Sequence, residues 1–243
     1  MNRKIILKSF SLIALICSLL SFKSQTIRLP KTIKIDTISN DYSKYLISYN
    51  FEYNNKNQLL KIIDSTKDKE KIIIQEINFK YNNDGRLVEY THKKKSSIAH
   101  YKIVYENNKI VMFPNKDSYN KLTILLDDSE KAIEIREVNE ENSYFNGISY
   151  PVYNENGNLE ELKKTKFEYG VSKGIFSDIN MDSWFRIYLS NQFPSAFMNF
   201  SKNILTKRSK ENSFKMNLQY VIENNYPIKI INPLITYKVE YIE

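Results

Sequence analysis

A short phrase recurs along this chain and constrains its fold more than any other feature. Each copy has a tyrosine at its third position, then mostly polar, asparagine-rich residues, then a new apolar stretch. The copies lie at 51–62, 79–90, 103–113, 151–162 and 218–231, where they begin FEYNN, FKYNN, IVYEN, PVYNE and LQYVI. Asparagine, aspartate and glycine favour the backbone conformations of tight turns. Each copy therefore predicts a strand, a tight turn and a second strand.

The turn residues of the copies agree with this interpretation. Segments 82–85 and 154–157 read NNDG and NENG, so a glycine is available for positive φ. The copies without glycine offer 55–57 and 107–108, where asparagine tolerates the left-handed region. Serial hairpins of this kind give an all-β antiparallel meander that curls into a roll or a soluble barrel. Alternating patterns predict further strands at 32–39, 46–53, 71–81, 86–93, 99–106, 109–114, 121–127, 131–138, 159–169, 214–223, 227–232 and 234–242.

One strand register follows from side-chain pairing in the hairpin 87–105. Placing Tyr90 opposite Tyr101 also brings Glu89 opposite Lys102, which joins an aromatic pair and an opposite-charge pair. A shift of one residue would place Tyr90 opposite Lys102 instead. In the favoured register His92 and His100 point to opposite faces of the sheet, so they do not form a metal site together.

Segment 176–206 breaks the strand pattern. Asp182 or Ser183 is a suitable cap for one short helix near 182–191, and Pro194 would end it. This segment is rich in aromatic side chains, which either pack over the sheet as core or form the lid or wall of a ligand pocket. The candidate ligand-binding residues are Trp184, Phe185, Tyr188, Phe193 and Phe197.

Residues 1–24 are typical of a signal peptide. Arg3, Lys4 and Lys8 precede an apolar stretch at 10–22 that is too short to span a membrane. Residues 25–243 are then expected to form one β-meander domain. The lone Cys17 follows Ile16, whereas a lipid-anchor signal requires small residues there, so lipoprotein anchoring through Cys17 is not expected. The protein is expected in the periplasm, on the outer surface or outside the cell.

Loss of the signal peptide lowers the formal charge. Four cations and no acids leave, so the value falls from +8 to +4. The lysines at 93–95 lie in one predicted hairpin tip and form no extended basic face, so no nucleic-acid partner is expected. Strands such as 159–169 carry charges without a continuous apolar face, so no integral membrane span is expected in the mature chain.

The motifs of common enzymes are missing from the sequence. We find no Gly-x-Ser-x-Gly motif, no glycine-rich phosphate loop and no cysteine after Cys17. Adjacent acidic pairs, such as 127–128, point to opposite faces of a strand. No catalytic, cofactor-binding or metal-binding residue is therefore predicted, and no cofactor. Acids from distant strands can still converge, which leaves a hydrolase as an alternative.

Two parts of the sequence resemble known families. The copies FKYNNDGRL and PVYNENGNL resemble the Tyr-Asp repeats of bacterial surface proteins. A wider resemblance covers FEY (167–169), the aromatic segment, SKNILTK (201–207), LQYVIENNYPIKI (218–230) and YKVEY (237–241). It is to secreted or lipid-anchored proteins of unknown function from Bacteroidetes-type bacteria with a porin-like β fold. This resemblance implies a curved antiparallel sheet and an exported protein, and it implies no catalytic residues.

Together these observations favour a non-enzymatic binding or structural protein of the cell envelope or secreted space. Its partner would be a glycan, a lipid, a peptide or another surface protein. The alternative is a hydrolase that acts on an envelope or extracellular polymer.

Overall fold

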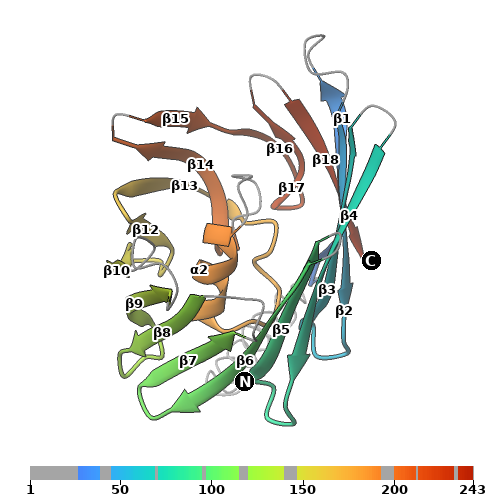
Figure 1. The fold of residues 1–243 in the computed structure, drawn as a ribbon. Helices are drawn as coiled ribbons and strands as arrows, with labels where there is room; N and C mark the ends of the chain where they lie inside the picture. The colour runs from blue at the N-terminus through green and yellow to red at the C-terminus, as the bar shows by residue number, and fades with distance from the viewer. Residues whose placement is uncertain are drawn as a thin grey trace, which may run out of the picture.

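The computed structural model describes residues 27–38, 45–68, 71–94, 97–114, 120–139, 147–192, 200–211, 213–232 and 235–242. These residues form two antiparallel β-sheets and a short helix (Figure 1). The all-β prediction is therefore confirmed. The helix is α2, Ser183–Gln192, which matches the predicted position.

The large sheet has 13 strands in the order β10-β9-β8-β7-β6-β5-β4-β3-β2-β1-β18-β17-β16. Neighbours along the chain are thus neighbours in the sheet, as expected for serial hairpins. The first and last strands, β1 and β18, pair with each other, but β10 and β16 remain at the two ends of the order. The strands are β1 (Leu29–Ile38), β2 (Tyr45–Tyr53), β3 (Leu59–Asp68), β4 (Lys71–Tyr81), β5 (Leu87–Lys94), β6 (Ser97–Glu106), β7 (Lys109–Pro114), β8 (Asn120–Leu126), β9 (Ala132–Asn139), β10 (Gly147–Ser149), β16 (Gln219–Glu223), β17 (Tyr226–Ile231) and β18 (Ile235–Ile242).

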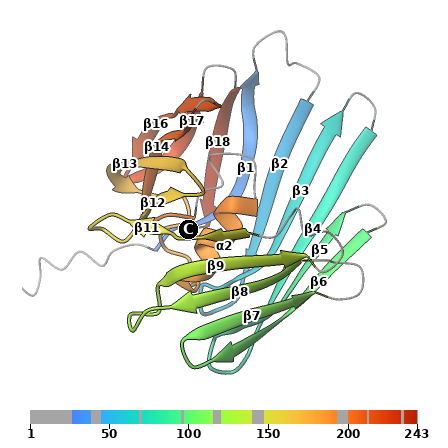
Figure 2. The same cartoon turned by 60° about the vertical axis from the view of Figure 1, so that its left-hand side comes forward.

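The small sheet has five strands in chain order. Backbone hydrogen bonds from Leu218 to Thr206 and from Lys173 to Asn225 join it to the β16–β17 end of the large sheet. Figure 2 shows α2 on the concave side of the large sheet, close to the small one. The strands are β11 (Val152–Tyr153), β12 (Leu159–Leu162), β13 (Thr165–Lys173), β14 (Asn203–Lys210) and β15 (Phe214–Asn217).

Two predicted strands are divided in the structure. Segment 159–169 contains a tight turn at Lys163 and Lys164, whose φ values are 50° and 61°. Lysine is not a residue type that favours tight turns, so the alternating pattern predicted one continuous strand here. Segment 214–223 divides between the two sheets at Leu218, because β15 belongs to the small sheet and β16 to the large one.

The predicted register of hairpin 87–105 is confirmed. Tyr90 lies opposite Tyr101, and Glu89 lies opposite Lys102. His92 faces Ala99, while His100 faces Thr91, so the two histidines lie on opposite faces as predicted.

Four turns share one backbone geometry that begins at an asparagine or aspartate. The side-chain oxygen of this residue accepts the amide hydrogen of the fourth residue along, at 2.9–3.0 Å in each turn. The residue before that amide has positive φ, as predicted for the asparagine- and glycine-rich copies. The turns start at Asn54, Asn82, Asp127 and Asn154, with positive φ at Asn57, Gly85, Glu130 and Gly157.

The tyrosines of the repeated phrase have a common structural role. Among the described residues, four tyrosines of the phrase donate a hydrogen bond from the hydroxyl to a main-chain carbonyl of a neighbouring strand or turn, and Tyr169 and Tyr241, outside the phrase, do the same. Each bond satisfies a polar tyrosine tip and a carbonyl near the end of a strand. The pairs are Tyr53–Pro30, Tyr81–Leu59, Tyr153–Ala132, Tyr169–Leu159, Tyr220–Leu205 and Tyr241–Pro227.

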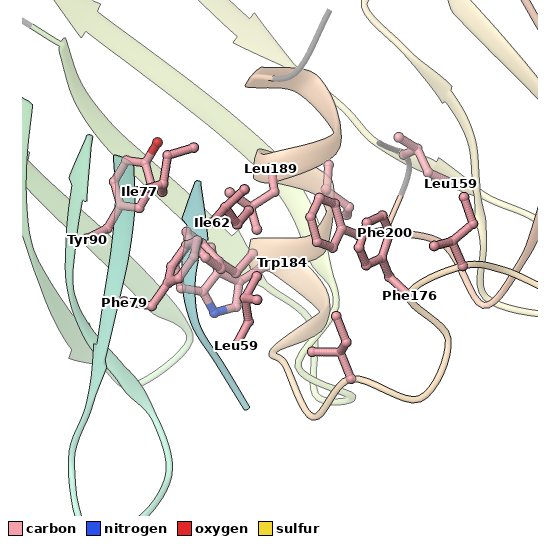
Figure 3. Packing of buried hydrophobic residues seen from close by; sticks show 14 of the residues in the cluster. Leu59, Ile62, Ile77, Phe79, Tyr90, Leu159, Phe176, Trp184, Leu189 and Phe200 are labelled. Atoms are coloured by element: carbon pink, nitrogen blue, oxygen red, sulfur yellow. The ribbon is translucent and has the colours of Figure 1, made fainter. Parts of the chain in front are cut away.

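The buried apolar side chains of both sheets and α2 belong to one cluster. Figure 3 shows Trp184 and Leu189 of α2 among the residues of β3 and β4, with Phe176 and Phe200 on the other side of the helix. The rings of Phe176 and Phe200 stack with their centroids 4.2 Å apart. The helix thus lies inside the core and separates the two sheets.

Candidate functional site

Helix α2 is held at its first turn by contacts with the large sheet. The carbonyl of Asp182 accepts the amide hydrogens of Phe185 and Arg186, so Asp182 precedes the helix at the capping position. Its carboxylate accepts a 2.9 Å hydrogen bond from the Tyr105 hydroxyl. Ser183 donates to the carbonyl of Glu130 at 3.0 Å. The sequence predicted a cap at Asp182 or Ser183, and both residues anchor the helix.

Three of the five predicted ligand-binding residues lie together on the side of α2 that faces the large sheet. Trp184 and Phe185 are 2% and 0% exposed, and Tyr188 is partly buried. Phe185 meets Phe79 and Tyr90 edge to face at 5.7 and 5.8 Å. These contacts are with protein side chains, so they give Trp184, Phe185 and Tyr188 a packing role.

The other two predicted residues, Phe193 and Phe197, lie outside the described residues, as does Pro194. Ligand binding by the aromatic set stays a prediction.

Arg186 lies on α2 and holds the segment that leads into the helix. Its guanidinium donates to the carbonyls of Phe176 and Phe200 at 2.9 Å each, and also to those of Ile179 and Met181. Burial lowers its pKa to about 10. Arginine suits this place because one planar group presents five donors. No sequence pattern marks this role, because all four partners are main-chain atoms.

Asp178 ties the same segment to the residue before β1 and to strands β13 and β17. Its carboxylate accepts hydrogen bonds from the Arg28 amide at 3.0 Å, from Lys173 Nζ at 2.9 Å and from the Tyr226 hydroxyl. Burial alone would raise the pKa of Asp178, but these hydrogen bonds and the lysine charge lower it. The backbone of Gly174 also packs closely against Ser201. A Cβ on Gly174 would lie only 2.4 Å from the Ser201 carbonyl oxygen. The segment before α2 is thus rigidly positioned.

A pocket of about 420 Å³ lies between α2, the 154–158 turn and residues 200–202. Arg186, Ile187 and Ser190 contribute from the helix. Tyr153 and Tyr169 contribute from the small sheet. Of the five predicted ligand-binding residues, the three that the structure describes, Trp184, Phe185 and Tyr188, are not among those that line it. Sequence reasoning missed this pocket because its described walls come from five separate segments.

Most polar groups in this pocket wall are already bonded to the main chain. The hydroxyls of Tyr153 and Tyr169 donate to carbonyls at 2.9 and 2.7 Å. Ser190 donates to the Arg186 carbonyl and accepts from the Phe200 amide, at 2.8 and 2.9 Å. Ser201 donates to the Asn203 carbonyl. The wall therefore keeps its shape without a ligand.

A second hollow of about 370 Å³ lies at the first turn of α2. Trp184 and Tyr105 contribute to it, together with Arg86, which lies 3.2 Å from Glu130 in an ion pair. Its lining is acidic and includes Asp127, Asp128, Glu130 and Asp182. The Asp127 carboxylate is already engaged in its own turn. This hollow brings together acids that are distant in sequence.

The two histidines have separate surroundings. His92 Nε2 lies 3.1 Å from Gln75 Oε1, and the amide of Gln75 reaches Asp64 at 3.4 Å. Burial lowers the pKa of His92 and raises the pKa of Asp64. His100, on the other face, lies 3.2 Å from Glu89. Within the described ranges, no three His, Cys, Asp or Glu side chains are grouped to hold a metal ion.

The chain matches no protein-family model, and no curated protein matches it either. Among solved structures, it is similar to a porin-like protein from Bacteroides uniformis, with 10% identity and a TM-score of 0.43, over 88% of this chain and 98% of that one. It is also similar to a porin-like protein from Bacteroides vulgatus, with 11% identity and a TM-score of 0.39, over 88% of this chain and 99% of that one. Similarities at this level carry no argument about function. The relation to Tyr-Asp repeats stays a prediction.

Among the described residues, no helix has the length and apolar character needed to cross a membrane.

Proposed function

We propose that this protein is a non-enzymatic binding protein of the cell envelope or secreted space, and that it holds a small ligand in the 420 Å³ pocket beside α2. The volume lies within the usual range for small-molecule sites, roughly 300–1,000 Å³. Arg186, Asp178 and Gly174 position one wall, and the 154–158 turn forms another.

The observation that carries this proposal is the fixed shape of the pocket wall. Tyr153, Tyr169 and Ser190 all bond to main-chain atoms, so the wall needs no rearrangement to receive a ligand. A site built in advance avoids much of the entropy lost when flexible groups are ordered by binding.

A substitution at the pocket rim tests the proposal. Asn156 is exposed and lines the pocket, so Asn156→Trp should obstruct it. Asp84 holds the same place in the 82–86 turn and is not recorded in the lining of either hollow, so Asp84→Trp is the matched control.

The measurement is ligand-observed ¹⁹F NMR with a mixture of anionic, cationic and neutral fluorinated fragments. We expect some fragments to bind the wild type and Asp84→Trp but not Asn156→Trp. Equal binding to all three proteins, or no binding to any, would contradict a pocket function.

We also propose export, based on the segment 1–24. The expected result is a mature protein that begins near Gln25 and is found outside the cytoplasm. Mass spectrometry of the protein from fractionated cells checks this. A full-length protein in the cytoplasm would contradict it.

A hydrolase is a second candidate, favoured by the acids of the 370 Å³ hollow. Asp182 and Glu130 come from different elements and line the same concave surface, as a pair of catalytic carboxylates must. The test is release of reducing sugars from extracellular polysaccharides by wild type, Asp182→Asn and Glu130→Gln. Release that both variants abolish would support this candidate, and no release by the wild type would oppose it.

A further inference from the structure

The charged groups of the 420 Å³ pocket point to the chemistry of its ligand. Among the described residues, three cations line the pocket, Lys131, Lys202 and Arg186, against one acid, Glu155. The lining therefore carries a formal excess of two positive charges. An excess of one sign in a concave site raises the local concentration of ligands of the opposite sign.

The two lysines are available to a ligand. Many lysines elsewhere in the described chain lie within 4 Å of a carboxylate, but no such ion pair is recorded for Lys131 or Lys202. The Nζ of Lys131 lies 5.8 Å from the centre of the Tyr153 ring, at the pocket wall. The Nζ of Lys202 lies 3.9 Å from the position that a Cβ on Gly157 would occupy. The Lys202 ammonium thus lies beside the 154–158 turn, and the Lys131 ammonium lies near the ring of Tyr153, which precedes this turn.

Arg186 adds a charge that, among the described residues, is in no recorded ion pair, although the Asp178 carboxylate acts on it from a greater distance. Its recorded partners are the carbonyls of Phe176, Ile179, Met181 and Phe200. Carbonyls satisfy the hydrogen bonds of a guanidinium but leave its net charge in place. The charge therefore acts on the pocket from within its wall.

The remaining polar groups favour a ligand with hydroxyls. The tyrosine and serine hydroxyls of the wall are bonded to the main chain, as described above. Besides the lysines, Glu155 and the Asn156 amide are exposed at the rim. An ionised carboxylate only accepts hydrogen bonds, and ligand hydroxyls are suitable donors to it.

We infer that the pocket binds a small acidic sugar, with the ligand carboxylate between Lys131 and Lys202 and the ligand hydroxyls toward Glu155 and Asn156. This inference rests on the proposed binding function and adds its ligand class. Each exposed ion pair contributes about two- to fivefold in affinity, so the two lysines together account for about tenfold.

Three sugars that share one ring and differ in charge test the inference. D-glucuronate is anionic, D-glucose is neutral and D-glucosamine is cationic near neutral pH. Saturation-transfer NMR with the full mature protein should rank their affinities in that order, with glucuronate about tenfold above glucose. Raising the salt concentration should reduce the preference for glucuronate, because exposed charges are screened.

Variants separate the pocket charges from the overall charge. Lys131→Gln with Lys202→Gln should remove the preference for glucuronate. Lys31→Gln with Lys71→Gln changes the net charge equally at exposed positions outside the pocket, and should preserve the preference.

Each outcome bears on the inference. Equal affinity for the three sugars, a preference that survives loss of Lys131 and Lys202, or no binding of glucuronate would overturn it. The fluorinated-fragment experiment with Asn156→Trp then decides separately whether the pocket binds any small molecule. Failure of the acidic-sugar inference is thereby distinguished from failure of the proposed function.

Discussion

At the scale of single residues, the tyrosine of the repeated phrase acts through its hydroxyl as well as its ring. Tyr53 illustrates this, because its hydroxyl donates to the carbonyl of Pro30 on the neighbouring strand at 2.8 Å. Burial raises its pKa well above the usual value, so the hydroxyl remains a donor. The tyrosines of the other described copies donate to a main-chain carbonyl in the same way. Tyr105 is the exception, because its hydroxyl donates to the Asp182 carboxylate.

We predict that Tyr53→Phe lowers the free energy of unfolding by about 1 kcal/mol, because it removes this bond and leaves the Pro30 carbonyl without the donor. Urea denaturation measures the change. Tyr150 is 63% exposed, and the structure records no hydrogen bond from its hydroxyl, so Tyr150→Phe is the control and should be close to neutral. A Tyr53→Phe variant as stable as the control would show that the ring alone matters.

The repetition of these tyrosines was visible in the sequence, but their partners were not. A carbonyl is present at every residue, so no residue type marks Pro30, Leu59 or Ala132 as an acceptor. For the same reason, the role of Arg186, whose guanidinium donates to four carbonyls, could not be predicted from the sequence.

At the scale of elements, the turns show where sequence patterns are sufficient. Asn57, Gly85 and Gly157 take positive φ, as their residue types predict. The turn at Asp127–Lys131 has the same geometry but places Glu130 at the positive φ, so its sequence gave no glycine or asparagine to recognise. Most strands of the large sheet followed from alternation or from the repeated phrase. The short strand β10 was not predicted, and neither was β14, which begins within the segment 176–206 that breaks the strand pattern.

Gly85→Ala should destabilise the protein by about 1–2 kcal/mol, because Gly85 has φ of +84° and a Cβ there would lie 3.1 Å from Gln58 Nε2. Gly147 has no atom within 4 Å of its added Cβ and no positive φ, so Gly147→Ala is the control. Thermal unfolding of both variants measures the difference. Equal melting temperatures would argue against the turn geometry described here.

Helix α2 should behave as a core element. Phe185 is fully buried between Phe79, Tyr90 and Trp184, and Phe185→Ala should cost about 3–5 kcal/mol of stability. Val171 is 97% exposed, so Val171→Ala should change stability by less than about 0.5 kcal/mol. Urea denaturation compares the two. A stable Phe185→Ala protein that has lost ligand binding would instead support the aromatic face as the site.

The candidate site was less accessible from sequence than the fold. The aromatic residues of 184–188 were predicted as candidate ligand-binding residues, but they lie on the side of α2 that faces the large sheet. The 420 Å³ pocket is lined instead by Arg186, Ile187 and Ser190, together with two turns of distant sequence. Only the three-dimensional arrangement of these segments reveals it.

At the scale of the whole molecule, buried tyrosines link stability to alkaline pH. Burial is the largest cause of a raised pKa at Tyr53, Tyr81, Tyr90, Tyr105, Tyr153, Tyr188, Tyr220, Tyr237 and Tyr241. Because the folded pKa exceeds the unfolded value of 10.0, their contribution is complete below pH 10.0 and is lost as the pH rises.

We therefore predict a cooperative alkaline unfolding above pH 10.0, where each buried tyrosine lowers stability by about 1.4 kcal/mol per pH unit. Near-ultraviolet absorbance follows the phenolates, and circular dichroism follows the strands. The two signals should change together. Phenolate formation near pH 10.0 in a protein that retains its strands would contradict the burial described here.

The central claim is that the pocket beside α2, rather than its aromatic face, receives the ligand. The most direct measurement is a titration of the ¹⁵N-labelled protein with D-glucuronate, followed by amide NMR. Trp184 is the only tryptophan in the sequence, so a single indole signal reports on the aromatic face and on the 370 Å³ hollow that Trp184 also lines. We predict shifts at the amides of Gly157 and Lys202 with an unchanged Trp184 indole signal. A shift of the indole signal, with Gly157 and Lys202 unchanged, would contradict this account.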